Sequence, residues 1–100
     1  MEFEWDEDKR QQIINTRDLD ILDAACIFDG YVLTRKDDRE NYGEDRFISL
    51  GLVDGDAYIV VHTQRDGVTR LITAWKGGRA DVEKYKARNA RRDQSDEEPG

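Results

Sequence analysis

The sequence predicts a single α+β domain, in which a small antiparallel β-sheet carries two N-terminal helices on one face and is followed by a C-terminal helix. Two observations support this fold class. Asp54-Gly55 and Asp66-Gly67 each separate two segments of alternating apolar residues, and Asp-Gly is typical of two-residue hairpin turns. Helical segments with capping residues lie before the first of these strands and after the last. Residues 1–92 are expected to form the domain, and the acidic residues 93–100 a disordered tail.

The first thirty residues are expected to form one strand and two helices. The strand covers residues 3–5, and Asp6 is a suitable N-cap for a helix that extends to about residue 16. Acidic residues occupy the first turn of this helix, where the helix dipole favours negative charge. Asp18 or Asp20 can cap a second helix that extends through residue 28, and Gly30 ends it.

The rest of the chain is expected to form strands and a last helix. A strand over residues 31–34 precedes a charged loop, and three strands joined by the two Asp-Gly turns follow. If both turns contain two residues, alternation places Arg46, Thr63 and Arg70 on one face of the sheet and His62 on the other. A helix over residues 79–92 follows Gly77-Gly78.

The same alternation divides the sheet into two faces of different character. The first face is mainly apolar and is expected to be the floor for the two N-terminal helices. The second mixes aromatic and polar groups and is expected to stay open as a binding surface. The first face contains Ile48, Leu50, Leu52, Ala57, Ile59, Val61, Ile72 and Ala74. The second contains Phe47, Ser49, Tyr58, Val60, His62, Thr69, Leu71, Thr73 and Trp75.

The segment from Leu33 to Gly51 carries the densest charge in the chain. Its loop gathers Arg35, Arg39 and Arg46 among several carboxylates. Guanidinium groups are planar, permanently charged and bidentate, so such a cluster suits a site that handles phosphate. The alternative is that the carboxylates pair with these arginines and the loop is simply solvated.

Composition limits the classes of function. The net charge is −7, but residues 70–92 hold eight basic residues against two acids, which allows a basic surface on an acidic protein. No apolar segment is long enough to span a bilayer and no signal peptide is evident, so a cytoplasmic location is expected. The single Cys26 excludes an internal disulfide and is expected to be buried and inert. Neither a zinc-type Cys/His set nor a glycine-rich phosphate loop occurs, so no cofactor is expected.

These residues together resemble the BrnT family of bacterial toxins over residues 3 to about 80. The resemblance is densest at Tyr42-Gly43-Glu44-Asp45-Arg46-Phe47-Ile48 and Gly51-Leu52-Val53-Asp54-Gly55. Further matching segments are Phe3-Glu4-Trp5-Asp6, Phe28-Asp29-Gly30, Leu33-Thr34-Arg35, Asp37-Asp38-Arg39 and Val60-Val61-His62-Thr63. The resemblance implies a RelE-like fold and a metal-independent ribonuclease that arrests translation, as the toxin of a type II toxin–antitoxin system. It also implies a BrnA-like antitoxin as the main partner, RNA as the substrate, operator DNA bound only through the antitoxin, and no membrane partner.

Metal-free RNA cleavage needs a base for the 2′-hydroxyl, an acid for the leaving oxygen and cations for the phosphate. The candidate catalytic residues are Glu44, Arg46, His62, Arg70 and Thr73, and the candidate RNA-binding residues are Arg39, Trp75 and Lys76. His62 titrates near neutral pH by default, and Trp75 can stack on a base. Each has a structural alternative: His62 and Trp75 as packing residues, Glu44, Arg46 and Arg70 as ion-pair partners, and Lys76 as a solvated lysine.

Two departures from the family pattern concern groups that could serve RNA. Members usually carry a Lys-His pair where this chain has Thr16-Arg17, and Ser-Ala-Arg where it has Thr73-Ala74-Trp75. The second replacement keeps a hydroxyl and loses a guanidinium. The resemblance therefore leaves an alternative function, a catalytically weakened toxin homologue that acts mainly as an antitoxin-binding corepressor module.

Overall fold

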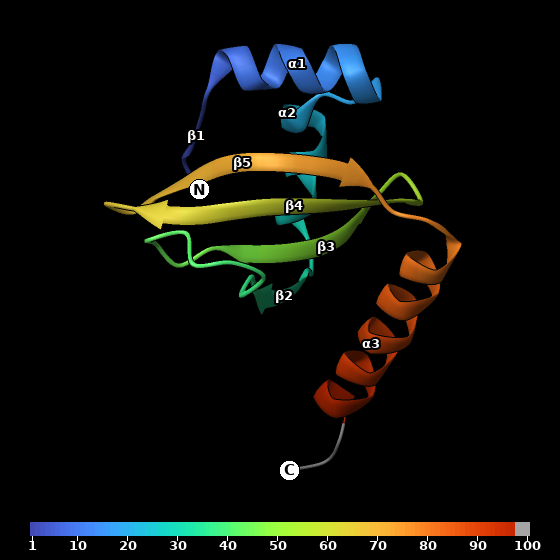
Figure 1. The fold of residues 1–100 in the computed structure, drawn as a ribbon. Helices are drawn as coiled ribbons and strands as arrows, with labels where there is room; N and C mark the ends of the chain where they lie inside the picture. Colours follow the sequence, from blue (N-terminus) through green and yellow to red (C-terminus); the bar gives the residue numbers. More distant parts are fainter. Residues whose placement is uncertain (98–100) are drawn as a thin grey trace.

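The computed structural model describes residues 1–97 of the chain, and side chains through residue 92. In chain order its elements are β1 (Phe3–Trp5), α1 (Glu7–Arg17), α2 (Ile21–Ala24), the 3₁₀ helix η1 (Ala25–Asp29), β2 (Leu33–Lys36), β3 (Phe47–Val53), β4 (Asp56–Arg65), β5 (Val68–Lys76) and α3 (Arg79–Glu97). Figure 1 shows the strands as one curved sheet, with α1 along its β5 side, α2 behind it and α3 as a separate rod. The α+β class is confirmed.

The sheet is larger than the sequence predicted and is not purely antiparallel. Its five strands lie in the order β1-β5-β4-β3-β2, and β1 pairs with β5 in parallel. β2 covers Leu33–Lys36 rather than residues 31–34, and it pairs with β3. The extent of the sheet was predicted wrongly because β1 and β2 are short edge strands, whose sequences do not specify a partner strand.

Both Asp-Gly turns are confirmed. The φ angle is 52° at Asp54 and at Asp66, and 85° and 81° at the following glycines, Gly55 and Gly67. Positive φ at both central residues is the geometry of a type I′ turn, which matches the twist of the flanking strands. The predicted pairing of β3 with β4 is confirmed over its full length, from Phe47–His62 to Val53–Asp56.

The pairing of β4 with β5 departs from the prediction half-way along the strands. The pairs next to the turn are as predicted, up to His62 opposite Leu71. A β-bulge between Val61 and His62 then makes Ile72 an extra residue of β5 and moves every later residue by one position. Trp75 therefore lies opposite Ile59 instead of Tyr58, and it lies on the other face of the sheet.

The N-terminal helices cover the face that the sequence predicted to be open. Phe28 of η1 packs edge-on against His62, with 5.0 Å between the ring centroids. The predicted floor for these helices instead faces α3. The buried core on the helix side contains Ile13, Leu19, Ile21, Ala24, Ala25, Ile27, Val60, Leu71 and Ala74.

Small side chains explain which face these helices select. A Cβ atom at Gly51 of β3 would come within 2.6 Å of Ile27 Cβ, so η1 can approach the sheet this closely only over a glycine. Ser49 on the same face is fully buried at 0% exposure, and its hydroxyl lies 2.7 Å from His62 Nε2. Both faces are rich in apolar residues, so apolar content alone did not distinguish them.

The N-terminal helices begin at predicted caps. The Asp6 side chain accepts hydrogen bonds from two amides of the first turn of α1, at 2.9 and 3.3 Å. Asp20 caps α2 and also accepts a two-bond contact from Arg10 at 2.9 and 2.7 Å, which joins α1 to α2. The expected second helix is divided, because α2 has only four residues and η1 continues it. Cys26 of η1, expected to be buried, is exposed.

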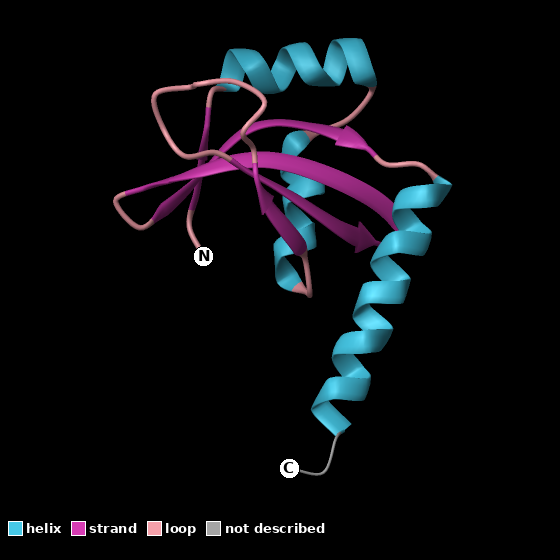
Figure 2. Ribbon diagram, turned by 60° about the horizontal axis from the view of Figure 1, so that its bottom comes forward, coloured by secondary structure: helices cyan, strands magenta, loops and turns pink. Residues whose placement is uncertain are grey.

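α3 lies on the other side of the sheet, away from the N-terminal helices (Figure 2). The Gly78 amide donates to Asp81 Oδ2 at 2.9 Å, which is one half of a capping box. The Tyr85 hydroxyl donates to the carbonyl of Tyr31 at 2.7 Å and fixes α3 near the start of β2. The helix extends to Glu97 rather than residue 92. Of the segment expected to be a disordered tail, residues 93–97 belong to α3, and residues 98–100 lie outside the described residues.

Candidate functional site

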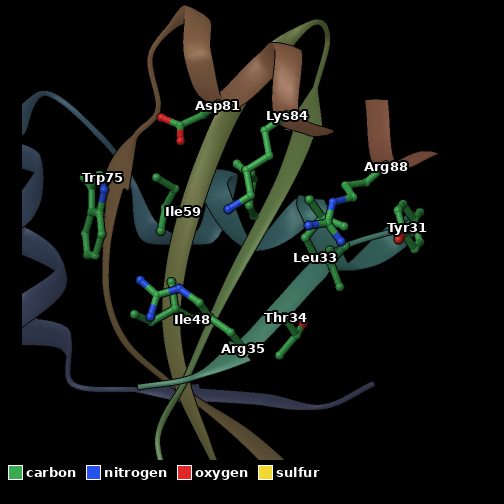
Figure 3. A pocket seen from close by; sticks show the side chains of 12 residues that line it. Tyr31, Leu33, Thr34, Arg35, Ile48, Ile59, Trp75, Asp81, Lys84 and Arg88 are labelled. Carbon is green, nitrogen blue, oxygen red and sulfur yellow. The ribbon is translucent and has the colours of Figure 1, made fainter. Parts of the chain in front are cut away.

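A pocket of about 650 Å³ lies between the sheet and α3, on the face opposite the N-terminal helices (Figure 3). Its floor is apolar and consists of Ile48, Leu50 and Ile59 from β3 and β4. Trp75 of β5 stands at one side of the pocket and Tyr31 at the other. This volume lies in the range typical of small-ligand sites.

Three basic side chains extend into this pocket. Figure 3 shows Lys84 and Arg88 extending from α3, and Arg35 from β2, toward the same space. Lys84 and Arg88 share one side of α3 because they are four residues apart. Among the described lining residues the only carboxylate is Asp81, which already accepts the hydrogen bond from the Gly78 amide. The pocket therefore has a net positive charge.

The charged loop reaches the pocket through Arg39. Its guanidinium carbon lies 6.0 Å from the centroid of the Trp75 ring, at the outer limit of a cation–π contact. Asp37 accepts hydrogen bonds from Arg39 Nε and Nη2 at 2.7 and 2.8 Å. Asp37 is only 3% exposed, and its hydrogen bonds with Arg39 lower its pKa to about 2. An ionised Asp37 thus holds Arg39 beside Trp75 at neutral pH.

Arg70 lies beside Thr63 as predicted, whereas Arg46 precedes β3 instead of belonging to it. Arg70 of β5 pairs directly with Thr63 and so shares its face, opposite to His62. The Thr63 hydroxyl donates to the carbonyl of Asp45, which places Arg46 on the other side of β4, immediately before β3. Both arginines also have carboxylate partners. Arg46 Nε lies 3.3 Å from Glu44 Oε2, and Arg70 Nη1 lies 3.6 Å from Glu4 Oε1.

Glu44 is the carboxylate partner of Arg46. It accepts hydrogen bonds from Arg65 at 2.9 Å and from Arg46 at 3.3 Å. These contacts, first that with Arg65, lower the pKa of Glu44 below its ordinary value. Glu44 is therefore ionised at neutral pH. The Tyr42 ring lies under the Arg46 guanidinium at 4.1 Å and orients it.

His62 lies apart from these charged residues. It is 8% exposed and packs between Phe28 and Phe47, at ring-centroid distances of 5.0 and 6.0 Å. Nε2 contacts Ser49 at 2.7 Å, whereas Nδ1 has no hydrogen-bond partner among the described residues. The structure thus gives His62 the surroundings of the packing histidine that the sequence offered as an alternative.

Burial lowers the pKa of His62 below its ordinary value near 6.5, because the charged ring would leave a buried N–H unpaired. The stability that its neutral form contributes is present above about pH 6.5 and is lost as the pH falls through the lower folded-state pKa. We expect the free energy of unfolding to fall between pH 7.5 and pH 5.5 in the natural chain, and His62→Gln to reduce that fall. Urea unfolding at both pH values measures it, and an equal fall in the two proteins would contradict this account.

The remaining candidates lie near the end of β5. The Thr73 hydroxyl accepts a hydrogen bond from Arg17 Nη1 at 3.0 Å, and the same nitrogen donates to the carbonyl of Ala74 at 2.9 Å. Arg17 was noted in the sequence as a departure from the family pattern, and it lies beside the second departure. Lys76 lies 3.6 Å from Asp56 and is exposed, as the solvated alternative predicted.

One family model matches most of the chain. It describes the ribonuclease toxin BrnT of a type II toxin–antitoxin system and matches residues 5–80. The chain belongs to the BrnT family. The resemblance seen in the sequence is therefore confirmed, and with it the class of ribonuclease toxins that act with an antitoxin. None of the curated proteins compared with the chain matches it.

Three pocket residues of this BrnT chain, Asp81, Lys84 and Arg88, lie beyond the matched region. The sequence indicated neither Lys84 nor Arg88 as a site residue, and it indicated Arg35 only as part of the charged loop. The signal that could have found them is the four-residue spacing of Lys84 and Arg88 on a basic helix. No group of three or more potential metal ligands occurs among the described residues, and no described helix is long and apolar enough to cross a membrane.

Proposed function

We propose that this BrnT chain cleaves single-stranded RNA without a metal ion, in the cytoplasm, and so arrests translation until a BrnA-like antitoxin neutralises it. One observation carries the proposal beyond family membership. Arg70 and Thr63 share the sheet face that bears Trp75 and the basic pocket, and the Glu44–Arg46 pair lies just before the start of β3, beside Thr63. An RNA strand on this face meets guanidinium groups for its phosphates and an aromatic ring for its bases.

The chemistry assigns different roles to these groups. In metal-free cleavage the 2′-oxygen attacks the adjacent phosphorus, the bond to the 5′-oxygen breaks, and a 2′,3′-cyclic phosphate forms. Glu44 is ionised and can accept the 2′-hydroxyl proton, while Arg46 and Arg70 stabilise the charge that develops on the phosphate. Thr73, held by Arg17, is proposed to orient the strand. We assign no proton transfer to His62, because it is buried on the opposite face, so water supplies the proton for the leaving oxygen.

Expression of the chain without its antitoxin tests this proposal. We expect slowed growth and cleaved cellular RNA with the natural chain. Glu44→Gln should slow cleavage by the purified protein by about 10²–10⁴-fold, because it removes the general base. Glu83→Gln on the exposed side of α3 is the matched control. Natural protein that is folded, free of antitoxin and unable to cut RNA would reject the proposal.

A second function is favoured by one specific observation. The Arg17 guanidinium is engaged inside the chain by Thr73 and Ala74, so the basic group at this departure from the family pattern does not extend freely toward a ligand. In this second proposal the chain mainly binds its antitoxin and raises the affinity of the antitoxin for operator DNA. The affinity of purified antitoxin for operator DNA, measured with and without this chain, separates the two. Tighter DNA binding together with absent RNA cleavage would select the corepressor.

A further inference from the structure

We propose that the pocket under α3 is a nucleotide subsite for single-stranded RNA, in which Trp75 stacks on a base while Arg35, Lys84 and Arg88 hold the adjoining phosphate. The inference rests on the proposed ribonuclease function and assigns it a second binding position. This position is separate from the Arg46–Arg70 pair that acts on the phosphate being cleaved.

The charge balance of the pocket points to an anionic ligand. The other arginines of the charged loop, Arg39 and Arg46, have carboxylate partners at 2.7 and 3.3 Å. No carboxylate of the described side chains lies within the 4.0 Å ion-pair distance of Arg35, Lys84 or Arg88. Three cations that share one pocket repel one another, and a bound anion removes that repulsion. Asp81 does not supply this anion, because its carboxylate caps α3.

The shape and lining of the pocket favour a nucleotide over a free anion. Its volume of about 650 Å³ and its floor of Ile48, Leu50 and Ile59 leave room for an apolar ring beside the charges. Trp75 presents an aromatic wall at this floor, and every base can stack on such a wall. Arg35 and Arg88 bring planar guanidinium groups, which suit phosphate oxygens. A base and its phosphate together match both halves of the lining.

The position of the pocket indicates how it contributes. On β4, Ile59 of the pocket floor lies four residues from Thr63, which pairs with Arg70. At about 3.3 Å per residue the two positions are about 13 Å apart along the strand. The pocket is therefore displaced from the scissile phosphate and positions the strand instead of taking part in the reaction. Its loss should raise KM for RNA and leave kcat nearly unchanged.

Binding of an uncleavable strand tests the subsite independently of activity. The ligand is a short single-stranded RNA with 2′-O-methyl groups throughout, and its affinity is measured by fluorescence anisotropy. We expect Lys84→Ala combined with Arg88→Ala to weaken binding by about tenfold or more, since phosphate contacts of charged groups are strong. Trp75→Leu should weaken it by about 5–150-fold through lost stacking.

A matched variant controls for general charge. Lys86→Ala combined with Arg91→Ala removes two exposed positive charges from α3 that do not line the pocket. If this control weakens binding as much as the Lys84/Arg88 variant does, the pocket is not a subsite. Circular dichroism confirms that each variant is folded.

Cleavage kinetics and antitoxin binding distinguish the remaining outcomes. Pocket-dependent binding of the uncleavable strand by a chain that cuts no RNA supports the subsite and rejects the proposed ribonuclease. Cleavage by the Lys84/Arg88 variant with unchanged KM rejects the subsite and leaves the ribonuclease intact. The charge reversals Lys84→Glu and Arg88→Glu are then combined. If this variant no longer binds the antitoxin but binds RNA as the natural chain does, the pocket is not an RNA subsite. The pocket then binds an acidic segment of the antitoxin.

Discussion

Replacing Arg70 with alanine is expected to lower the rate of RNA cleavage by about 10²–10³-fold, the usual effect of removing one preorganised donor to developing charge. Arg70 shares a face of the sheet with Thr63, and its side chain is 28% exposed, so it can meet the charge on the phosphate. Its ion pair with Glu4 is partly exposed and 3.6 Å long, so its loss should change stability by less than about 1 kcal/mol. Single-turnover cleavage of a defined RNA measures the effect.

Arg46→Ala should lower the rate by a similar factor, because it removes the second guanidinium of the pair. The matched control is Arg79→Ala, which removes an exposed arginine at the start of α3. Natural rates in both the Arg46 and the Arg70 variant would show that these arginines are only ion-pair partners of Glu44 and Glu4. Equal losses in the control and the two variants would point to overall charge instead of a site.

Gly51→Ala is expected to destabilise the fold by about 1–3 kcal/mol, through overpacking between β3 and η1. An added Cβ would lie 2.6 Å from Ile27 Cβ and 3.3 Å from Val32 Cγ1, and Ile27 is 1% exposed and has no room to move. For a domain of this size each kcal/mol corresponds to about 4–8 °C in Tm. Thermal unfolding followed by circular dichroism measures the change.

Gly30→Ala is the control for this prediction. A Cβ at Gly30 would meet no atom within 4 Å, and its φ of −131° is accessible to alanine. Its Tm should therefore stay within a few degrees of the natural value. A Gly51→Ala chain that melts together with the Gly30→Ala chain would contradict the close approach of η1 to the sheet.

Local chemistry explains the part of the fold that the sequence predicts well. Asp54-Gly55 and Asp66-Gly67 demand positive φ angles, so they determine two hairpins and the whole register of β3 with β4. Asp6 and Asp20 supply carboxylates at helix starts, where backbone amides lack partners. Each of these signals acts within a few residues and needs no knowledge of the rest of the chain.

The predictions from the sequence are wrong where packing between residues far apart in the chain determines the structure. The bulge at Ile72 has no glycine or other local marker, yet it transfers Trp75 to the opposite face from the one predicted. The face covered by the N-terminal helices was also predicted wrongly, because both faces are apolar and only Gly51 and Ser49 mark the close contact. The two wrong predictions cancel for Trp75, because both the residue and the N-terminal helices lie on the opposite face from the one predicted. Trp75 therefore still lies on the face that the N-terminal helices leave uncovered, as the sequence predicted.

The candidate site was predictable only in part for the same reason. Arg46 and Arg70 lie next to a pairing that the turns determine, so their places about Thr63 followed from the sequence. The pocket joins residues from β2, β5 and α3, and its partners Lys84 and Arg88 lie up to 53 residues away from Arg35 in the sequence. The direction in which α3 leaves β5 depends on its contact with Tyr31, which no local pattern encodes.

Cleavage of matched RNA and DNA strands in the presence of a chelator tests the proposed metal-free reaction. The substrates are one single-stranded RNA and the same sequence with 2′-deoxyribose throughout, both incubated with purified, antitoxin-free chain in excess EDTA. We expect that only the RNA is cut and that the new ends carry 2′,3′-cyclic phosphates, because the 2′-hydroxyl is the nucleophile. Intact RNA under these conditions, or cleavage that appears only when a divalent metal is restored, would contradict it.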